Sequence, residues 1–379
     1  MGRRELLIIA VFAVLGAGAY LAMAPPAKPG ERGFSLRDLF QHVRTEMQGE
    51  SAFSSITLSR DHVVSEAIRD VAVDHFRGAV RVIGEDRRDI AAELKAEVGG
   101  PDMREAENRA RNVTLTIDGV ADAVRVRVTV PPQVRRQKLE LTIKAPSRLR
   151  AQLTGVRGAM DVRGMAEASV LAGRLDTRIQ DVAGAVRIDH REGPVDIVNV
   201  GSVHITGRRD EVRVTDVRGD CVLDVTDGRL ELRGIAGEIT IEARRTGVEL
   251  RRPVAPVRIT AFDARIDIRE SRAPLRLEGD RSPTRIEVEI PAAISASMAD
   301  APLDVRLPAQ AAATLEAVAI DARIRADDFA LPVTGDDAER RLSGTVGAGG
   351  PLISLRTRRG EISVQKLSID PPQSTVDRR

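Results

Sequence analysis

Between residues 203 and 277 a short unit of apolar, polar and apolar residues recurs, with strand starts nine residues apart over eight successive intervals. A strand this short buries two aliphatic side chains, which is too little to be stable alone. Stacked copies would share one continuous aliphatic core, and the glycines between copies would let the chain turn. The spacing therefore predicts a parallel β-solenoid. The units occupy residues 186–188, 195–197, 203–205, 212–214, 221–223, 230–232, 239–241, 248–250, 257–259, 266–268 and 275–277.

The nine-residue spacing leaves the size of a coil open. Two faces give coils of about 18 residues, and three faces give about 27. An 18-residue coil stacks Glu231, Glu249 and Asp267 on one face, where like charges repel. A 27-residue coil stacks His204, Glu231 and Arg258, which is slightly more favourable, but exposed pairs contribute well under about 1 kcal/mol. An antiparallel β-sandwich of hairpins is the structural alternative.

The segments on either side of the solenoid, which we place at residues 151–282, also alternate apolar and polar residues. Residues 63–150 are predicted to form a small N-terminal β-domain. Residues 283–369 contain longer strands and are expected to cap the stack, while residues 370–379 form a disordered tail. The chain has no Trp, one Tyr and seven Phe, and a core of Val, Ile, Leu and Ala suits thin β-structure. The predicted fold class is all-β.

An uncharged apolar run occupies residues 6–24, directly after two arginines. As a helix it would be roughly 28 Å long, close to the hydrocarbon thickness of a bilayer. Basic residues before the run keep that end in the cytoplasm and export the rest. We predict a signal-anchor transmembrane helix in residues 1–24, with the bulk of the chain extracytoplasmic, either periplasmic or extracellular. Cleavage after Ala24 is the alternative, although Pro25 would then follow the cut.

Residues 25–62 are predicted to be a linker followed by a short amphipathic helix. Three prolines within residues 25–29 favour a stiff, extended start. Ser35 is a suitable N-cap for a helix that carries apolar residues at helical spacing up to Met47. This helix would pack on the first domain or lie on the membrane surface.

Residues that carry out catalysis or bind metals are present, but not at the required spacing. No two histidines have the spacing of a metal site, and each is expected to be a surface residue. Cys221 is the single cysteine and falls at an inward position, where it serves as a small core residue. We therefore expect no catalytic, cofactor-binding or metal-binding residues and no cofactor. The five histidines are His42, His62, His75, His190 and His204.

The charge balance, 58 Lys and Arg against 56 Asp and Glu, argues against a dedicated nucleic-acid binder. The expected partners are the membrane, through residues 6–24, and an unknown protein, glycan or second copy of the chain. Parallel β-helices can also carry polysaccharide-cleaving sites, which need carboxylates and basic residues on one face. The same alternation of charge is typical of a solvated sheet face. Residues of the types needed for cleavage are Asp189, Asp196, Asp267, Arg258 and Arg276.

Four segments carry a resemblance to a known family: residues 71–84, 139–146, 155–164 and 353–364. They resemble the strand–glycine–strand opening, the glycine-punctuated middle and the closing strands of the bacterial putative-adhesin domains of unknown function. The resemblance covers about residues 63–369, with a departure in the long segment from 283 to 350. It implies an extracytoplasmic β-solenoid without catalytic residues. We therefore expect a non-enzymatic, membrane-anchored, adhesin-like binding or structural protein of the bacterial envelope. The alternative is a carbohydrate-active enzyme, a lyase or hydrolase, on the same scaffold.

Overall fold

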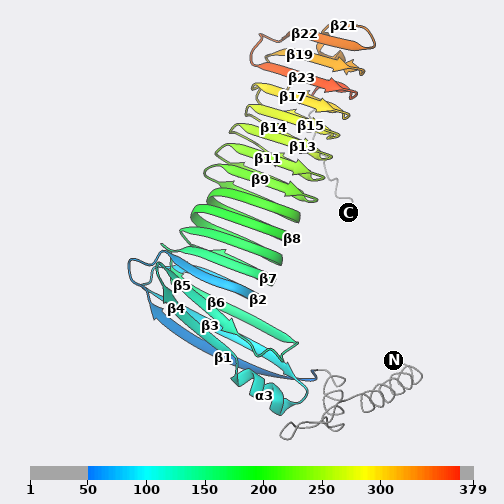
Figure 1. Cartoon of the computed structure of the whole chain (residues 1–379). Helices are drawn as coiled ribbons and strands as arrows, with labels where there is room; N and C mark the ends of the chain where they lie inside the picture. Colours follow the sequence, from blue (N-terminus) through cyan, green and yellow to red (C-terminus); the bar gives the residue numbers. More distant parts are fainter. Residues whose placement is uncertain (1–49, 368–379) are drawn as a thin grey trace, which may run out of the picture. The chain divides into compact units, whose positions relative to one another are not determined.

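The computed structural model describes residues 50–367 (Figure 1). The described chain is built from strands β1 to β24 with one α-helix, α3 (Met103–Arg111), which confirms the all-β class. None of the helices in residues 50–367 is both long enough and apolar enough to cross a membrane. The predicted anchor in residues 1–24, the predicted amphipathic helix and the tail in residues 370–379 lie outside the described residues.

The first strands form a mixed sheet. Strand β1 (Ala52–Val63) pairs antiparallel with β3 (Asp89–Gly100), and β3 pairs antiparallel with β6 (Gln137–Pro146). Because β1 starts at Ala52, the linker predicted for residues 25–62 is wrong from residue 52 onward. The side chains of β1 alternate in exposure, and every second one faces inward, which is typical of a strand and not of a linker.

Parallel pairing begins at β2 (Asp70–Glu85). It pairs in parallel with β6, with β5 (Ala123–Thr129) and with β7 (Arg150–Arg163). Strand β4 (Thr114–Val120) forms an antiparallel hairpin with β5. Strand β7 then pairs in parallel with the start of β8, so the pairing crosses residue 150 without a break.

From β8 (Glu167–Val217) onward successive strands contribute alternately to two parallel ladders. Ladder 1 contains β9 (Cys221–Thr226), β11 (Ile239–Arg244), β13 (Val257–Phe262), β15 (Leu275–Asp280), β17 (Ile294–Ala299) and β23 (Leu352–Arg358). Ladder 2 contains β10 (Arg229–Ile235), β12 (Gly247–Arg251), β14 (Arg265–Ser271), β16 (Thr284–Val288), β18 (Leu303–Leu307) and β24 (Ile362–Lys366). Strand β8 pairs with the first strand of each ladder.

The register fixes the size of a coil. Leu230 lies beside Val212 on one side and Val248 on the other, each eighteen residues away. The 27-residue spacing that exposed charges slightly favoured is therefore wrong. Inward aliphatic side chains determine the register: Val257 and Ile259 are 3% and 0% exposed, while Arg258 between them faces solvent. Burial of such side chains is worth about 1.5–3 kcal/mol each, far more than an exposed charge pair.

The end of the stack does not follow chain order. Strand β19 (Ala313–Ile320) pairs in parallel with β23, which lies between β17 and β19. Antiparallel strands β22 (Glu339–Val346) and β21 (Val333–Gly335) follow β19 and cover the end of ladder 1 (Figure 1). In ladder 2, β24 pairs with both β18 and β20 (Ile324–Arg325).

Candidate functional site

The corners that follow the strands of ladder 1 carry residues with positive φ. Asp227 has a φ of 59° and Arg245 a φ of 49°, although neither is a glycine. The left-handed conformation costs an L-residue roughly 1–2 kcal/mol. From Asp227 onward it is held because the corner N–H donates to a carbonyl of the neighbouring strand's end, as Asp227 N does to Arg244 O at 2.9 Å. We call these residues the corner column: Glu192, Arg209, Asp227, Arg245, Asp263, Arg281, Asp300, Arg359 and Asp321.

The corner column alternates in charge and neutralises itself. Arg245 binds Asp227 through Nε–Oδ1 and Nη2–Oδ2 contacts of 2.5 and 2.9 Å. Arg281 binds Asp263 in the same way, at 2.5 and 3.0 Å. The hydrogen bond from Arg245 lowers the pKa of Asp227 below its ordinary value, and that from Arg281 does the same for the pKa of Asp263. This part of the edge therefore has little charge left for a ligand.

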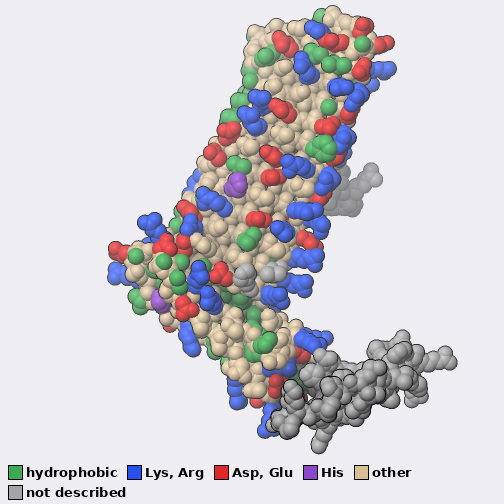
Figure 2. Space-filling view, in the orientation of Figure 1, with side chains coloured by type: hydrophobic (Ala, Val, Ile, Leu, Met, Phe, Trp, Pro, Cys, Tyr) green, Lys and Arg blue, Asp and Glu red, His purple; other side chains and the backbone are tan. Residues whose placement is uncertain are grey.

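At its N-terminal end the edge carries arginines instead. Arg77 on β2, Arg157 on β7 and Arg174 on β8 are register partners on three adjacent strands. Like charges on neighbouring strands repel, so the fold gains nothing from this arrangement. Figure 2 shows Lys and Arg side chains gathered on the edge beside β7 and β8. We call this group the arginine cluster: Arg77, Arg157, Arg174, Arg191, Arg208 and Arg209.

A hollow of about 410 Å³ lies within the arginine cluster and is lined by five of its arginines. Glu192 is the one carboxylate among the described residues that line it. Its Oε2 lies 2.9 Å from Arg174 Nε and 3.9 Å from Arg209 Nη1. Arg157 and Arg191, like Arg208, are exposed, and the side chains of these three residues make no hydrogen bond or ion pair with another residue of 50–367. The hollow is therefore electropositive.

A second groove of about 840 Å³ lies beside the hollow. The two share Arg157, and the groove also contains Arg77, Arg135 and Lys138. Lys138 pairs with Glu140 at 2.9 Å, and this contact lowers the pKa of Glu140. Together the two recesses form a basic path that runs from β6 across β2 and β7 to β8.

A buried pair lies directly beneath the arginine cluster. His190 is 1% exposed and Asp210 is 2% exposed. His190 Nδ1 lies 2.8 Å from Asp210 Oδ1, and Glu192 N donates to the same oxygen at 2.7 Å. The expectation that His190 is a surface residue is wrong, because its side chain continues the inward series of Val186 and Ile188. That alternation is the signal that could have located it.

Of the other histidines, His204 is exposed on β8 and His62 is half-buried on β1. The side chain of His75 and all of His42 lie outside what the structure describes. Within the described residues no three His, Cys, Asp or Glu side chains come together as metal ligands. Cys221 is buried as predicted, and burial raises the pKa of its thiol to about 12.

The residues considered for polysaccharide cleavage are not brought to one place. Asp267 lies on ladder 2, whereas Arg258 and Arg276 are register partners on ladder 1. Asp189 is exposed on β8, and Asp196 pairs with Arg178 at 3.3 Å.

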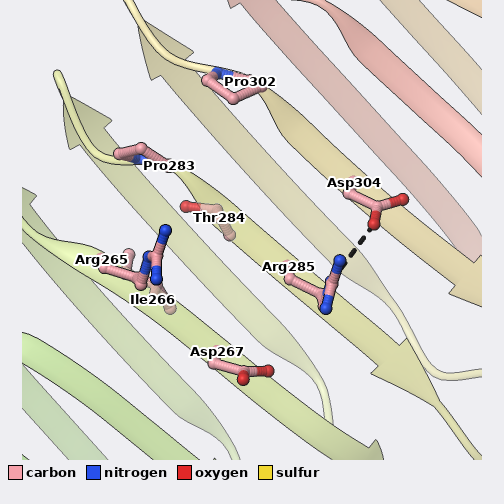
Figure 3. Close-up of a pocket in the computed structure, with 8 residues that line it drawn as sticks. All are labelled: Arg265, Ile266, Asp267, Pro283, Thr284, Arg285, Pro302 and Asp304. Atoms are coloured by element: carbon pink, nitrogen blue, oxygen red, sulfur yellow. Dashed lines mark hydrogen bonds and ion pairs between the residues drawn. The ribbon is translucent and has the colours of Figure 1, made fainter.

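Figure 3 shows the surroundings of Asp267, a pocket of about 260 Å³ on ladder 2. Arg285 is the register partner of both Asp267 and Asp304, and its Nε binds Asp304 Oδ2 at 3.3 Å. Asp267 instead receives two hydrogen bonds from Arg269, the shorter 2.6 Å. Both carboxylates of this pocket are therefore paired with an arginine.

The stack of Glu231, Glu249 and Asp267, which an 18-residue spacing implies and like-charge repulsion disfavours, is present, and arginines neutralise it. Arg229 Nη2 lies 3.0 Å from Glu231 and 3.3 Å from Glu249. Arg251 binds Glu249 at 2.6 Å and lowers its pKa. A general acid for glycoside cleavage needs a raised pKa. The lowered pKa of Glu249 is the opposite of what such an acid needs.

Comparison with known proteins finds no family model and no curated protein that matches the chain. Similar solved structures include a putative cell adhesion protein from Clostridium sporogenes, 7% identical, covering 82% of this chain and 100% of its own, with a TM-score of 0.20. A putative adhesin from Parabacteroides merdae is 10% identical, covering 84% and 98%, with a TM-score of 0.30. A putative lipid binding protein from Parabacteroides distasonis is 8% identical, covering 82% and 97%, with a TM-score of 0.28. Solved structures described as bacterial putative adhesins, the family that the sequence resembles, are thus among those similar to this chain. Sequence identity this low does not allow a ligand or an activity to be assigned to this chain.

Proposed function

We propose that the protein is a non-enzymatic, adhesin-like binding protein of the bacterial envelope, and that its arginine cluster binds an anionic partner. Residues 6–24 hold it in the cytoplasmic membrane, and the remainder works on the outer side. The observation that carries the proposal is the contrast along one edge. The corner column pairs its own charges, whereas Arg157, Arg191 and Arg208 have no such partner within the described residues.

The scaffold in this proposal is a two-sided parallel β-solenoid. Two ladders with an eighteen-residue register, both lined inward by aliphatic side chains, support it. Such a stack is rigid because each coil is held by its neighbours, and it can present side chains from many coils in fixed register. A broad surface of this kind suits an extended partner.

The absence of catalysis belongs to the same proposal. It is supported by the arginine pairing of the ladder 2 carboxylates and by the lowered pKa of Glu249. The competing function, a carbohydrate-active enzyme, would need one carboxyl group poised as an acid. Incubation of the full chain with polysaccharides should release no new reducing ends or unsaturated products. Release that a single Asp or Glu substitution on ladder 2 abolishes would overturn the non-enzymatic part.

Binding can be tested with a charge-matched pair of variants of the full chain in detergent. The first carries Arg157→Glu, Arg191→Glu and Arg208→Glu. The control carries Arg258→Glu, Arg323→Glu and Arg356→Glu, which are exposed arginines elsewhere that form no ion pair in residues 50–367. Retention is measured on surfaces coated with polyglutamate, polyphosphate or polygalacturonate. We expect the first variant to lose retention and the control to keep it. No retention of the native chain on any surface, or equal loss in both variants, would overturn the proposal.

A further inference from the structure

The geometry points to one class of ligand for the arginine cluster: a linear acidic polysaccharide that lies across the strands, along the edge of the coils. This inference rests on the proposed function and narrows it. It requires a ligand whose anionic groups recur at short, regular intervals along an extended chain. A uronic acid polymer, with one carboxylate on each sugar, has this chemistry.

The spacing of the arginines follows from the register. Arg77, Arg157 and Arg174 occupy equivalent positions on adjacent strands, so their backbones are spaced at about 4.8 Å intervals. Arg191 and Arg208 line the same hollow from β8. A guanidinium group binds a carboxylate or sulfate through two parallel N–H donors, which favours anions in fixed positions over diffuse charge. The arginine cluster thus presents a row of guanidinium groups, each of which can donate two parallel hydrogen bonds to one anionic group.

Glu192 has a defined part in this site. Its carboxylate holds Arg174 at 2.9 Å and approaches Arg209 at 3.9 Å. The backbone N–H of Glu192 is fixed by Asp210, so the carboxylate starts from a rigid corner. A ligand carboxylate that binds Arg174 competes with Glu192, which therefore acts as an internal counter-ion. Removing its charge should strengthen binding.

The path is long enough for several sugar units. The groove of about 840 Å³ meets the hollow of about 410 Å³ at Arg157. Lys138 lines the far part of the groove, and Pro131 and Pro132 supply apolar surface there. A polysaccharide can therefore run from β6 to β8 with both charged and apolar contacts.

Nucleic acids fit the site less well. Single strands bind proteins largely by stacking bases on aromatic rings, and the described residues that line the two recesses include no aromatic side chain. Duplex phosphates advance about 3.4 Å per nucleotide along the helix axis on each strand, and they wind around that axis instead of forming a straight row. The recessed shape also suits one chain better than a planar layer of lipid headgroups.

The test measures the affinity of the full chain for polygalacturonate. Methyl-esterified polygalacturonate is the matched neutral probe; single-stranded DNA, duplex DNA and phosphatidylglycerol vesicles are the competitors. We expect binding to the acid form alone, weakened by salt. The Arg157→Glu, Arg191→Glu, Arg208→Glu variant should bind at least about thirtyfold more weakly, since each charge-assisted contact is worth about tenfold. The Arg258→Glu, Arg323→Glu, Arg356→Glu control should stay within about twofold.

The substitution Glu192→Gln should tighten binding about threefold or more, a gain that misfolding would not produce. Unchanged or weaker binding by this variant would overturn the counter-ion role. Equal or tighter binding to DNA or vesicles, lost in the arginine variant, would overturn the polysaccharide and leave the proposed function standing. Absence of binding to every anionic probe would overturn both.

Discussion

His190 Nδ1 lies 2.8 Å from Asp210 Oδ1, and the side chains of both residues are fully enclosed. The other ring nitrogen, Nε2, lies 3.0 Å from Leu175 O, so both nitrogens face oxygen atoms. The Leu175 carbonyl can only accept a hydrogen bond, and the Asp210 carboxyl group lies against the other ring nitrogen. The pair joins the strand segment that carries Arg174 to the corner that carries Glu192.

Replacement of His190 by Ala should be strongly destabilising. It leaves the carboxylate of Asp210 buried without its partner, and breaking a buried pair in this way typically costs about 3–5 kcal/mol. Urea unfolding of His190→Ala should show a much lower midpoint than the native chain. His204→Ala is the control, because His204 is exposed on the same strand and its loss should change stability by less than about 0.5 kcal/mol. Equal midpoints would contradict the structural role of the pair.

The corner column makes stability sensitive to acid. Arginine partners lower the folded-state pKa of Asp227, Asp263 and Asp300 below the ordinary value of 3.8. Their contribution is complete above the unfolded-state pKa and is lost as the pH falls through the lower folded-state values. In thermal melts the Tm should therefore fall as the pH is lowered below about 4.

The matched variant carries Asp227→Asn, Asp263→Asn and Asp300→Asn. Its Tm should be lower than that of the native chain at neutral pH, and the difference should shrink as the pH falls. A constant difference down to pH 2 would mean that the corner carboxylates are not the groups responsible.

A charge placed in the shared core should disturb several coils at once. Ile239 on β11 is completely buried and pairs with Cys221 and Val257 on the neighbouring strands. Ile239→Asp buries an unpaired carboxylate, and hydrogen exchange should accelerate in β9 and β13 as well as in β11. Val222→Asp is the control, because Val222 is 37% exposed and faces outward from β9. Faster exchange in β11 alone would argue against a common interior.

The predicted location can be tested by labelling with a membrane-impermeant maleimide. Thr206 is exposed on β8, so Thr206→Cys should react in intact spheroplasts if the bulk of the chain lies outside the cytoplasmic membrane. The native Cys221 should stay silent, since its thiol is buried and its pKa is raised to about 12. Labelling of Thr206→Cys only after lysis would place the chain on the cytoplasmic side.

The sequence predicted the strands of the two ladders, but it did not predict the conformation of the corner residues between them. The alternation of Ile266 and Ile268 with Asp267 predicts that both isoleucines face inward. Their burial then determines the register of β14 against β12. Corner residues such as Arg245 give no such signal, because glycine is the usual mark of a positive φ. The hydrogen bond from its N–H to the next coil supports this conformation, and that bond depends on the stacking itself.

The arginine cluster was out of reach of the sequence for a related reason. Arg77 and Arg157 become neighbours only through the pairing of β2 with β7, eighty residues apart in the chain. The sequence shows arginines spread along the whole chain, so only the folded edge distinguishes those with a carboxylate partner from those without. The position of β23 between β17 and β19 is likewise a long-range choice that no local pattern indicates.

The placement of β23 has a consequence for how the molecule is completed. Strand β17 cannot acquire its outer neighbour until residues 352–358 have emerged, even though β19 is synthesised before them. Until then β17 presents unpaired N–H and C=O groups, the kind of edge on which other chains add strands. Proteolytic trimming or premature termination near residue 350 would therefore leave an aggregation-prone fragment with an exposed strand edge, not a shorter version of the same protein.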